Sequence, residues 1–152
     1  MQVTQLLDKD HVKYEIREHR PVFQAQRLAQ EEHVKGTNVA KPVIVKADGQ
    51  FYMCVIPACC NLDLETVKSI LASDSIELVD EAQFEKMFPD CELGAEPPFG
   101  SIYGLPVLLD DRLENDEFIV FQAGTHTQAI KMSMAEYKRM ERPAVFSFSY
   151  HV

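Results

Sequence analysis

The chain has 152 residues, a length typical of one folded domain, with 46% hydrophobic and 26% charged residues. This composition excludes an intrinsically disordered chain, and the apolar runs fall well short of the roughly 20 residues that span a bilayer. Fifteen basic against twenty-four acidic residues give a net charge of −9, which excludes a broad polyanion-binding surface, so any nucleic acid must be held locally.

The first half of the chain predicts short helices and strands that meet in hairpins. The strongest local signal is Asp48-Gly49, because this pair accepts the positive backbone angles of a two-residue turn and apolar residues of period two flank it. Helical and period-two patterns place the other elements. In chain order we predict a helix at 2–9, a strand at 12–16, a helix at 24–33, hairpin strands at 39–45 and 51–55, and a helix at 63–73.

The second half predicts a long irregular loop between two groups of regular elements. Asp80 with Gln83 and Ser133 with Glu136 form capping-box patterns that mark the starts of helices. The segment 89–104 is too rich in proline and glycine for regular structure. In chain order we predict a strand at 76–79, a helix at 81–87, strands at 106–109, 117–122 and 128–132, a helix from 133 to about 140, and a final strand at 144–148.

These elements predict an α/β domain. Strands and helices do not alternate regularly along the chain, and hairpins are frequent. We therefore expect a curved mixed sheet or partly closed barrel of about seven strands with short helices packed outside. No linker interrupts the chain, so we expect a single domain over residues 1–152. The first residues lack the basic start and apolar stretch of a secretion signal, so we expect a cytoplasmic protein without membrane contact.

The cysteines and histidines predict neither a metal site nor a cofactor. No CxxC pair is present, and the histidines are scattered along the chain. Cys59 and Cys60 are adjacent, a poor geometry for an ordinary disulfide, and their role stays open. Cys91 is flanked by carboxylates, which raise the pKa of a thiol and make it a weak nucleophile.

Three features remain as candidates for chemistry, since the chain carries no phosphate-binding glycine loop, nucleophile elbow or HExxH motif. Lys41 lies at the start of the first hairpin strand, and Pro42 beside it favours a strand edge or start. The loop Gly94–Gly100 has two prolines and two glycines, so it presents carbonyls that suit an ammonium ligand. His126 lies in a loop between two strands. Each feature has a structural alternative: Lys41 is an exposed lysine at a sheet edge, the loop is a rigid connector, and His126 is a surface histidine.

Taken in order, several segments resemble the YbaK/ProX-type editing domains, which occur alone and as an insertion in bacterial prolyl-tRNA synthetases. The resemblance covers roughly residues 5 to 148. The segments that carry it are Val39-Ala40-Lys41, the Asp48-Gly49 hairpin into Val55-Ile56-Pro57-Ala58, Leu62-Asp63-Leu64, Gly94–Gly100, Leu105-Pro106-Val107 to Asp110, and Phe121-Gln122-Ala123-Gly124-Thr125-His126.

The resemblance implies a YbaK-like fold and hydrolysis of the ester that joins an amino acid to the terminal adenosine of tRNA. Lys41 corresponds to the lysine of the family, and Gly94–Pro98 corresponds to its GxxxP loop. The chain departs from the YbaK branch at Pro97-Pro98-Phe99 and at Thr125-His126, and it is similar to a branch with a PPFG loop. The identity of the amino acid therefore does not transfer.

The resulting hypothesis is a trans-editing deacylase that acts on the acceptor end of a mischarged tRNA, with an aminoacyl-tRNA synthetase as a further partner left open. The ester is activated by its own α-ammonium, and the neighbouring ribose hydroxyl can position the attacking water, so the protein mainly orients the substrate. We expect Lys41 and His126 to be catalytic. The expected substrate-binding residues are Gly94, Ala95, Glu96, Pro97, Pro98, Phe99, Gly100, Gly124 and Thr125.

Selectivity is expected from the size of the pocket, with Phe99, Val43 and Val45 as candidate walls. Two other classes of function stay open. One is a non-catalytic tRNA- or synthetase-binding module of the same fold, and the other is an unrelated ligand-binding or protein-interaction domain. The acidic charge favours these two, whereas Lys41 together with the proline loop favours the enzyme.

Overall fold

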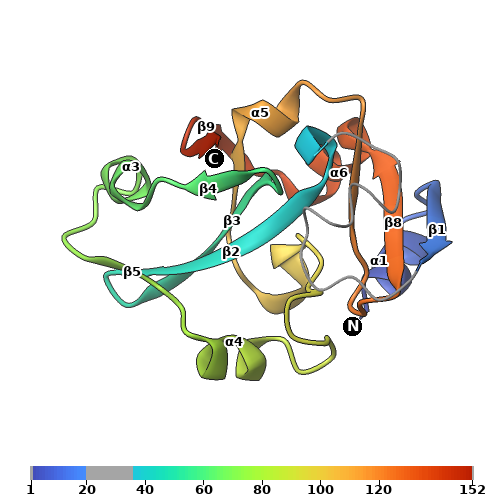
Figure 1. Ribbon diagram of the computed structural model, residues 1–152, viewed down its shortest axis with the longest axis horizontal. Coiled ribbons are helices and arrows are strands. Elements are labelled where there is room, and N and C mark those ends of the chain that lie inside the picture. Colours follow the sequence, from blue (N-terminus) through green and yellow to red (C-terminus); the bar gives the residue numbers. More distant parts are fainter. Residues whose placement is uncertain (1, 20–35, 152) are drawn as a thin grey trace.

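The computed structural model describes residues 2–19 and 36–151, and the helix predicted at 24–33 lies outside them. The described strands form two larger sheets and a two-stranded ribbon (Figure 1). The elements in chain order are α1 Val3–Lys9, β1 Tyr14–Glu18, β2 Ala40–Ala47, β3 Gln50–Pro57, β4 Cys60–Leu62, α3 Leu64–Ile70, β5 Ile76–Leu78, α4 Glu81–Met87, β6 Val107–Asp110, α5 Asp111–Glu114, β7 Phe118–Gln122, β8 Gln128–Ser133, α6 Met134–Glu141, β9 Ala144–Phe146 and β10 Ser149–His151.

The larger sheet has the strand order β5-β2-β3-β6-β9 and is mixed. The β2–β3 hairpin is antiparallel, as predicted, whereas β6 pairs in parallel with both β3 and β9. The turn residues Asp48 and Gly49 have φ angles of 48° and 84°. Two positive φ angles match the twist of the flanking strands, which explains why this pair predicts the hairpin from local sequence alone.

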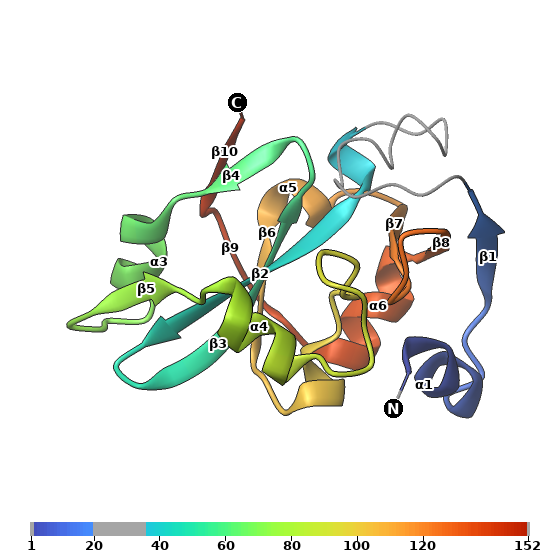
Figure 2. The same ribbon diagram turned by 60° about the horizontal axis from the view of Figure 1, so that its bottom comes forward.

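The smaller sheet is antiparallel, with the order β1-β8-β7. An isolated parallel bridge between Val39, just before β2, and Val120 in β7 joins the two larger sheets. Figure 2 shows the start of β2 beside β7. The predicted α/β fold with a mixed sheet and short helices is confirmed, and the described strands do not close into a full barrel.

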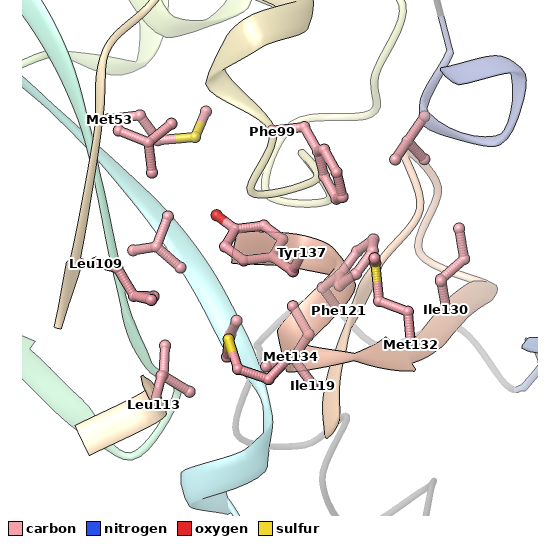
Figure 3. Packing of buried hydrophobic residues seen from close by; sticks show 14 of the residues in the cluster. Met53, Phe99, Leu109, Leu113, Ile119, Phe121, Ile130, Met132, Met134 and Tyr137 are labelled. Carbon is pink, nitrogen blue, oxygen red and sulfur yellow. The ribbon is translucent and has the colours of Figure 1, made fainter. Parts of the chain in front are cut away.

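The main hydrophobic core lies between these two sheets. Tyr137 of α6 is fully buried at its centre. Met53 and Leu109 of the larger sheet and Phe121 and Ile130 of the smaller one belong to the same buried cluster (Figure 3). A helix therefore contributes a large aromatic side chain to the space that the two sheets enclose.

Several short elements were not predicted. The described residues form ten strands. Two of them, β4 and β10, were not predicted, and they pair with each other. The predicted final strand at 144–148 is wrong in extent: it ends at Phe146, and the amide of Phe148 donates to the buried Asp110 carboxylate at 3.0 Å. Because this amide bonds to a side chain and not to a neighbouring strand, the pairing of β9 does not continue to residue 148. A new strand, β10, begins at Ser149. The one-turn helix α5 follows the same carboxylate, which caps it.

Candidate active site

The loop Gly94–Gly100 is anchored between the two larger sheets by the side chain of Phe99. This ring is fully buried, with its centroid 5.4 Å from that of Phe121 and 5.2 Å from that of Tyr137 (Figure 3). The side chain of Phe99, predicted to contact substrate, is therefore part of the main core. Val45, another candidate wall, is buried in a separate hydrophobic cluster, and Val43 packs against that cluster. Because the anchor is buried, the backbone around it is held in one place.

Four carbonyls of this loop accept hydrogen bonds from the protein, and that of Gly100 accepts from the amide of Leu105 at 2.9 Å. The amide of Gly124 donates to the Ala95 oxygen at 2.8 Å, and the amide of Phe99 donates to the Pro97 oxygen at 2.8 Å. The hydroxyl of Tyr137 donates to the Pro98 oxygen at 2.6 Å. In the described part of the chain, no donor reaches the carbonyls of Gly94 and Glu96.

Glu96 turns its carboxylate back onto the loop. The side chain is only 5% exposed, and it accepts a hydrogen bond from the amide of Gly94 at 3.0 Å. Burial raises the pKa of this carboxyl, while the amides of Glu96 and Gly94 and the nearby His126 act in the opposite direction. The loop therefore contains a buried acidic group that stabilises its glycine end.

His126 and Gly124 connect the β7–β8 turn to the segment that precedes the loop. The Nε2 atom of His126 lies 2.8 Å from the Leu93 oxygen, and its amide donates to the Glu92 carboxylate at 2.9 Å. The amide of Glu92 donates in turn to the Gly124 oxygen at 2.8 Å. The structure thus brings together the predicted segments 94–100 and 124–126.

A hollow of about 90 Å³ lies where these segments meet α1. Pro97, Gly124 and Thr125, all predicted site residues, line part of it. Cys91 and Tyr103 line it as well, with the thiol 3.3 Å from the phenol oxygen. Burial raises the pKa of the Cys91 thiol, in keeping with its dismissal as a nucleophile. Tyr103 carried no signal in the sequence, because it comes next to the hollow only through folding.

Lys41 does not line this hollow. It lies at the second position of β2, paired with Ile56, and its side chain is partly exposed near the thiols of Cys59 and Cys60. Burial lowers the pKa of the Lys41 amine, and the two thiols act in the other direction. No hydrogen bond between Lys41 and the segment 94–100 occurs among the described residues. The two predicted parts are linked instead through β7, which touches β2 at the Val39–Val120 bridge.

Two further findings concern metal binding and membrane crossing in residues 2–19 and 36–151. In these ranges no three histidine, cysteine or acidic side chains are placed to share a metal ion. None of the helices in the same ranges combines the length and the apolar character needed to cross a membrane.

Comparisons with known proteins show which family the chain belongs to. The family described as the aminoacyl-tRNA editing domain matches residues 19–140. The multifunctional Ser/Thr-tRNA deacylase ProXp-y of Escherichia coli strain K12 is 24% identical over 151 residues, covering 94% of this chain and 88% of that protein.

Two crystal structures share the fold at low sequence identity. The hypothetical protein APE2540 has a TM-score of 0.89 at 16% identity, with 99% of this chain and 100% of that chain covered. A candidate trans-editing enzyme for prolyl-tRNA synthetase has a TM-score of 0.84 at 17% identity, with 97% and 94% covered. The family match extends over most of the chain and includes every predicted site residue, so the chain belongs to the aminoacyl-tRNA editing domain family.

Proposed function

We propose that this protein is a trans-acting deacylase of the cytoplasm that hydrolyses the ester between an amino acid and the terminal adenosine of a mischarged tRNA. The observation that carries the proposal is the family match over residues 19–140, which includes Lys41, the segment 94–100 and the segment 124–126. The relative from Escherichia coli is named a Ser/Thr-tRNA deacylase, which supports the same reaction class.

In this proposal the segment 94–100 binds the α-ammonium of the aminoacyl group through the two carbonyls that the protein leaves unused, those of Gly94 and Glu96. A carbonyl held by a rigid backbone is an acceptor that does not need to reorganise when the substrate binds. Phe99 contributes through this rigidity, and Gly100 contributes because it allows close packing. A Cβ atom at Gly100 would lie 2.5 Å from the Leu105 oxygen.

The proposed chemical step is attack of water on the ester carbonyl, with the neighbouring ribose hydroxyl orienting the water. Lys41 contacts the ester carbonyl oxygen or the phosphate next to the adenosine and stabilises negative charge there. His126 has a positioning role. Its Nε2 atom forms a hydrogen bond with the Leu93 oxygen and so fixes the residue that precedes the loop. Gly124 and Thr125 form the wall beside the loop.

A deacylation panel tests the proposal. Transfer RNAs charged with alanine, serine, cysteine, threonine and proline are incubated with the protein, and loss of the ester is compared with a control without protein. The name of the Escherichia coli relative makes serine and threonine the substrates with the highest expected rates. If none of the five esters is cleaved faster than in the control, the enzyme reading is wrong.

The Lys41→Met variant tests the role of the amine. We expect deacylation to fall by about 100-fold, the effect typical of losing one group that stabilises developing charge. Lys46→Met is the matched control, because Lys46 lies on the same strand but five residues away, so its side chain leaves the opposite face of the sheet. Equal activity of the two variants would contradict the role of Lys41.

A second function has one observation in its favour. The net charge of −9 is unusual for an enzyme that binds RNA, and it fits a non-catalytic module that binds a synthetase or a tRNA end without hydrolysis. The same panel distinguishes the two functions, because the module binds charged tRNA but leaves the ester intact.

A further inference from the structure

A second hollow, of about 340 Å³, lies on the smaller sheet and is several times larger than the one beside the proline loop. None of the predicted site residues lines it. Its volume is within the range of sites that bind ligands. Cationic, acidic and aromatic side chains line it from three neighbouring strands and the residues just before them, among them Lys13, Glu15, Glu117, Phe118, Lys131 and Ser133.

The fold brings together two lysines that are far apart in the sequence. Lys13 immediately precedes β1, and Lys131 lies in β8. Because β1 pairs antiparallel with β8, the second residue of β1, Glu15, lies opposite Lys131. Figure 2 shows β8 between β1 and β7. The two amines therefore border one hollow.

Both amines keep their charge available for an external anion. In residues 2–19 and 36–151, no carboxylate forms an ion pair with Lys13 or Lys131. Of the two acidic side chains in the lining, Glu15 is paired with Arg17 at 2.9 Å, so its charge is largely balanced. Glu117 is exposed and remains the one carboxylate of this lining that opposes an anion.

Phe118 holds the amine of Lys131 in place. The Nζ atom lies 4.1 Å from the centroid of the ring, and both side chains are half-buried. The ring itself packs against the buried cluster that contains Val120 and Ala129, so it is a fixed support. A cation over an aromatic face is attracted to it without losing its charge. The amine is therefore positioned before a ligand arrives, which lowers the entropic cost of binding.

The hollow is separate from the proposed site for the ester. Phe118 pairs with Ser133 at one end of the β7–β8 hairpin, and Gln122 pairs with Ala129 at the other. The predicted site segment 124–126 follows this second end. The five residues of β7 span roughly 13 Å, at about 3.3 Å for each step. A ligand in the hollow therefore contacts a part of the substrate other than the terminal adenosine.

We propose that this hollow binds the phosphate backbone of the tRNA acceptor end, with the amines of Lys13 and Lys131 in contact with phosphate oxygens. The complementarity is one of charge, since two unpaired cations face a polyanion. It also explains how a chain with a net charge of −9 holds RNA, because the contact is confined to one positioned pair of lysines. This inference rests on the proposed deacylase function and names the surface that holds its substrate.

The decisive variant is Lys131→Met, and the probe is uncharged tRNA, whose affinity is measured by fluorescence anisotropy. We expect affinity at low salt to fall about fivefold, and the slope of log K against log salt to become less steep by about 0.7 to 0.9. Lys46→Met is the matched control, because Lys46 also lies over a ring, 5.5 Å from the centroid of Phe51, but on the larger sheet. It removes the same charge and should leave the slope unchanged.

Two results of this measurement would overturn the proposal. One is equal affinity and equal slope for Lys131→Met and Lys46→Met, since the position of the lysine would then not matter. The other is an absence of tRNA binding by the wild type at about 50 mM salt, where phosphate contacts are strong. Lys131→Arg keeps the charge over the ring, and we expect it to retain the affinity of the wild type.

Glu117→Gln tests the hollow from the opposite direction. It removes the carboxylate that opposes a phosphate there, so we expect affinity for tRNA to rise about twofold. Glu65→Gln, at an exposed position of α3, changes the net charge by the same amount and is the matched control. If both variants bind tRNA equally tightly, the effect is one of overall charge and the hollow is not the binding surface.

A probe without phosphates separates this inference from the proposed function. The probe is 3′-seryl-amino-3′-deoxyadenosine, whose amide bond resists hydrolysis, and we expect wild type and Lys131→Met to bind it equally. An equal loss for this probe and for tRNA would overturn the proposal, because the substitution would then disturb the site for the terminal adenosine. If tRNA binding depends on Lys131 but no ester is cleaved, the deacylase proposal fails and the phosphate contact stands.

Discussion

At the scale of single residues, the loop 94–100 contains a carboxylate whose burial is unfavourable to its charged form. Glu96 satisfies the amide of Gly94 from a position that is almost fully buried. Burial raises the pKa of this carboxyl above its usual range, so the folded state favours the protonated form. The hydrogen bond does not need the negative charge, since a neutral amide oxygen accepts from Gly94 as well.

The substitution Glu96→Gln should therefore stabilise the protein in a pH-dependent way. Since the folded pKa is raised, wild type loses stability as the pH rises through the usual carboxyl range toward neutrality. We expect the two proteins to have similar free energies of unfolding near about pH 4, and the glutamine variant to be the more stable near about pH 7. Urea unfolding across this range measures the difference. A gap that does not change with pH would contradict the assignment of a raised pKa.

At the scale of elements, α6 acts as a strut for the loop. Its Tyr137 hydroxyl donates to the Pro98 oxygen at 2.6 Å. One turn later, Glu141 accepts from the amide of Ser101 at 3.0 Å and from its hydroxyl at 2.5 Å. The helix therefore holds the backbone on both sides of Phe99. Pro98 has no amide hydrogen, so the loop offers few backbone donors of its own to fix this path.

Tyr137→Phe tests the strut, because it removes one hydroxyl and leaves the Pro98 carbonyl buried without a donor. We expect the free energy of unfolding to fall by about 1–3 kcal/mol. Deacylation should fall as well, since the loop loses a contact that fixes its carbonyls. Tyr150→Phe is the control, because that ring is exposed on β10. Equal stability of the two variants would indicate that the Pro98 carbonyl finds another donor.

At the scale of the whole molecule, a single buried carboxylate connects the end of the chain to the larger sheet. Asp110 is fully buried at the end of β6. It accepts from the amides of Phe148 and Ser149 at 3.0 and 3.2 Å, and from the hydroxyl of Ser149 at 2.6 Å. These contacts hold the C-terminal segment where β10 pairs with β4, and Phe148 packs in the same hydrophobic cluster as Val67 of α3.

Asp110→Ala should therefore destabilise the whole fold. It leaves three buried donors without an acceptor, and we expect a loss of about 3 kcal/mol or more in the free energy of unfolding. The neighbouring exposed Asp111 gives the matched control, Asp111→Ala, which should change stability by less than about 1 kcal/mol. Chemical denaturation of both variants provides the comparison. A small effect at Asp110 would mean that the C-terminal segment is not required for stability.

The acidic surface of the molecule predicts how it binds RNA. With a net charge of −9, only a local group of basic side chains can contact phosphates. We expect log K for charged tRNA to fall with log salt at a slope no steeper than about −3, which corresponds to three or four phosphate contacts. Affinity measured between about 50 and about 200 mM salt gives this slope. A much steeper dependence would reveal an extended basic surface.

Local patterns predicted much of the fold because the causes are local. Asp48-Gly49 specifies its hairpin through the backbone angles that these two residues accept, and Asp80 caps α4 through a hydrogen bond to Gln83 three residues away. The ribbon of β4 and β10 escaped prediction because its two strands are distant in the chain and short. Neither strand has an alternating sequence pattern. The two strands pair in the folded protein, where Asp110 holds the C-terminal segment in place.

The chemistry of the chain alone was enough to single out Lys41, the stiff loop 94–100 and the turn with His126, because unusual residue types at close spacing mark each of them. Only the folded molecule decided which loop carbonyls stay unoccupied, since Gly124 and Tyr137 come from other parts of the chain. Among residues 2–19 and 36–151, it also shows that the buried side-chain oxygen of Gln122, an ordinary polar residue in the sequence, has no hydrogen-bond donor. Burial and hydrogen-bond partnership depend on neighbours that are remote in sequence, and no local pattern encodes them.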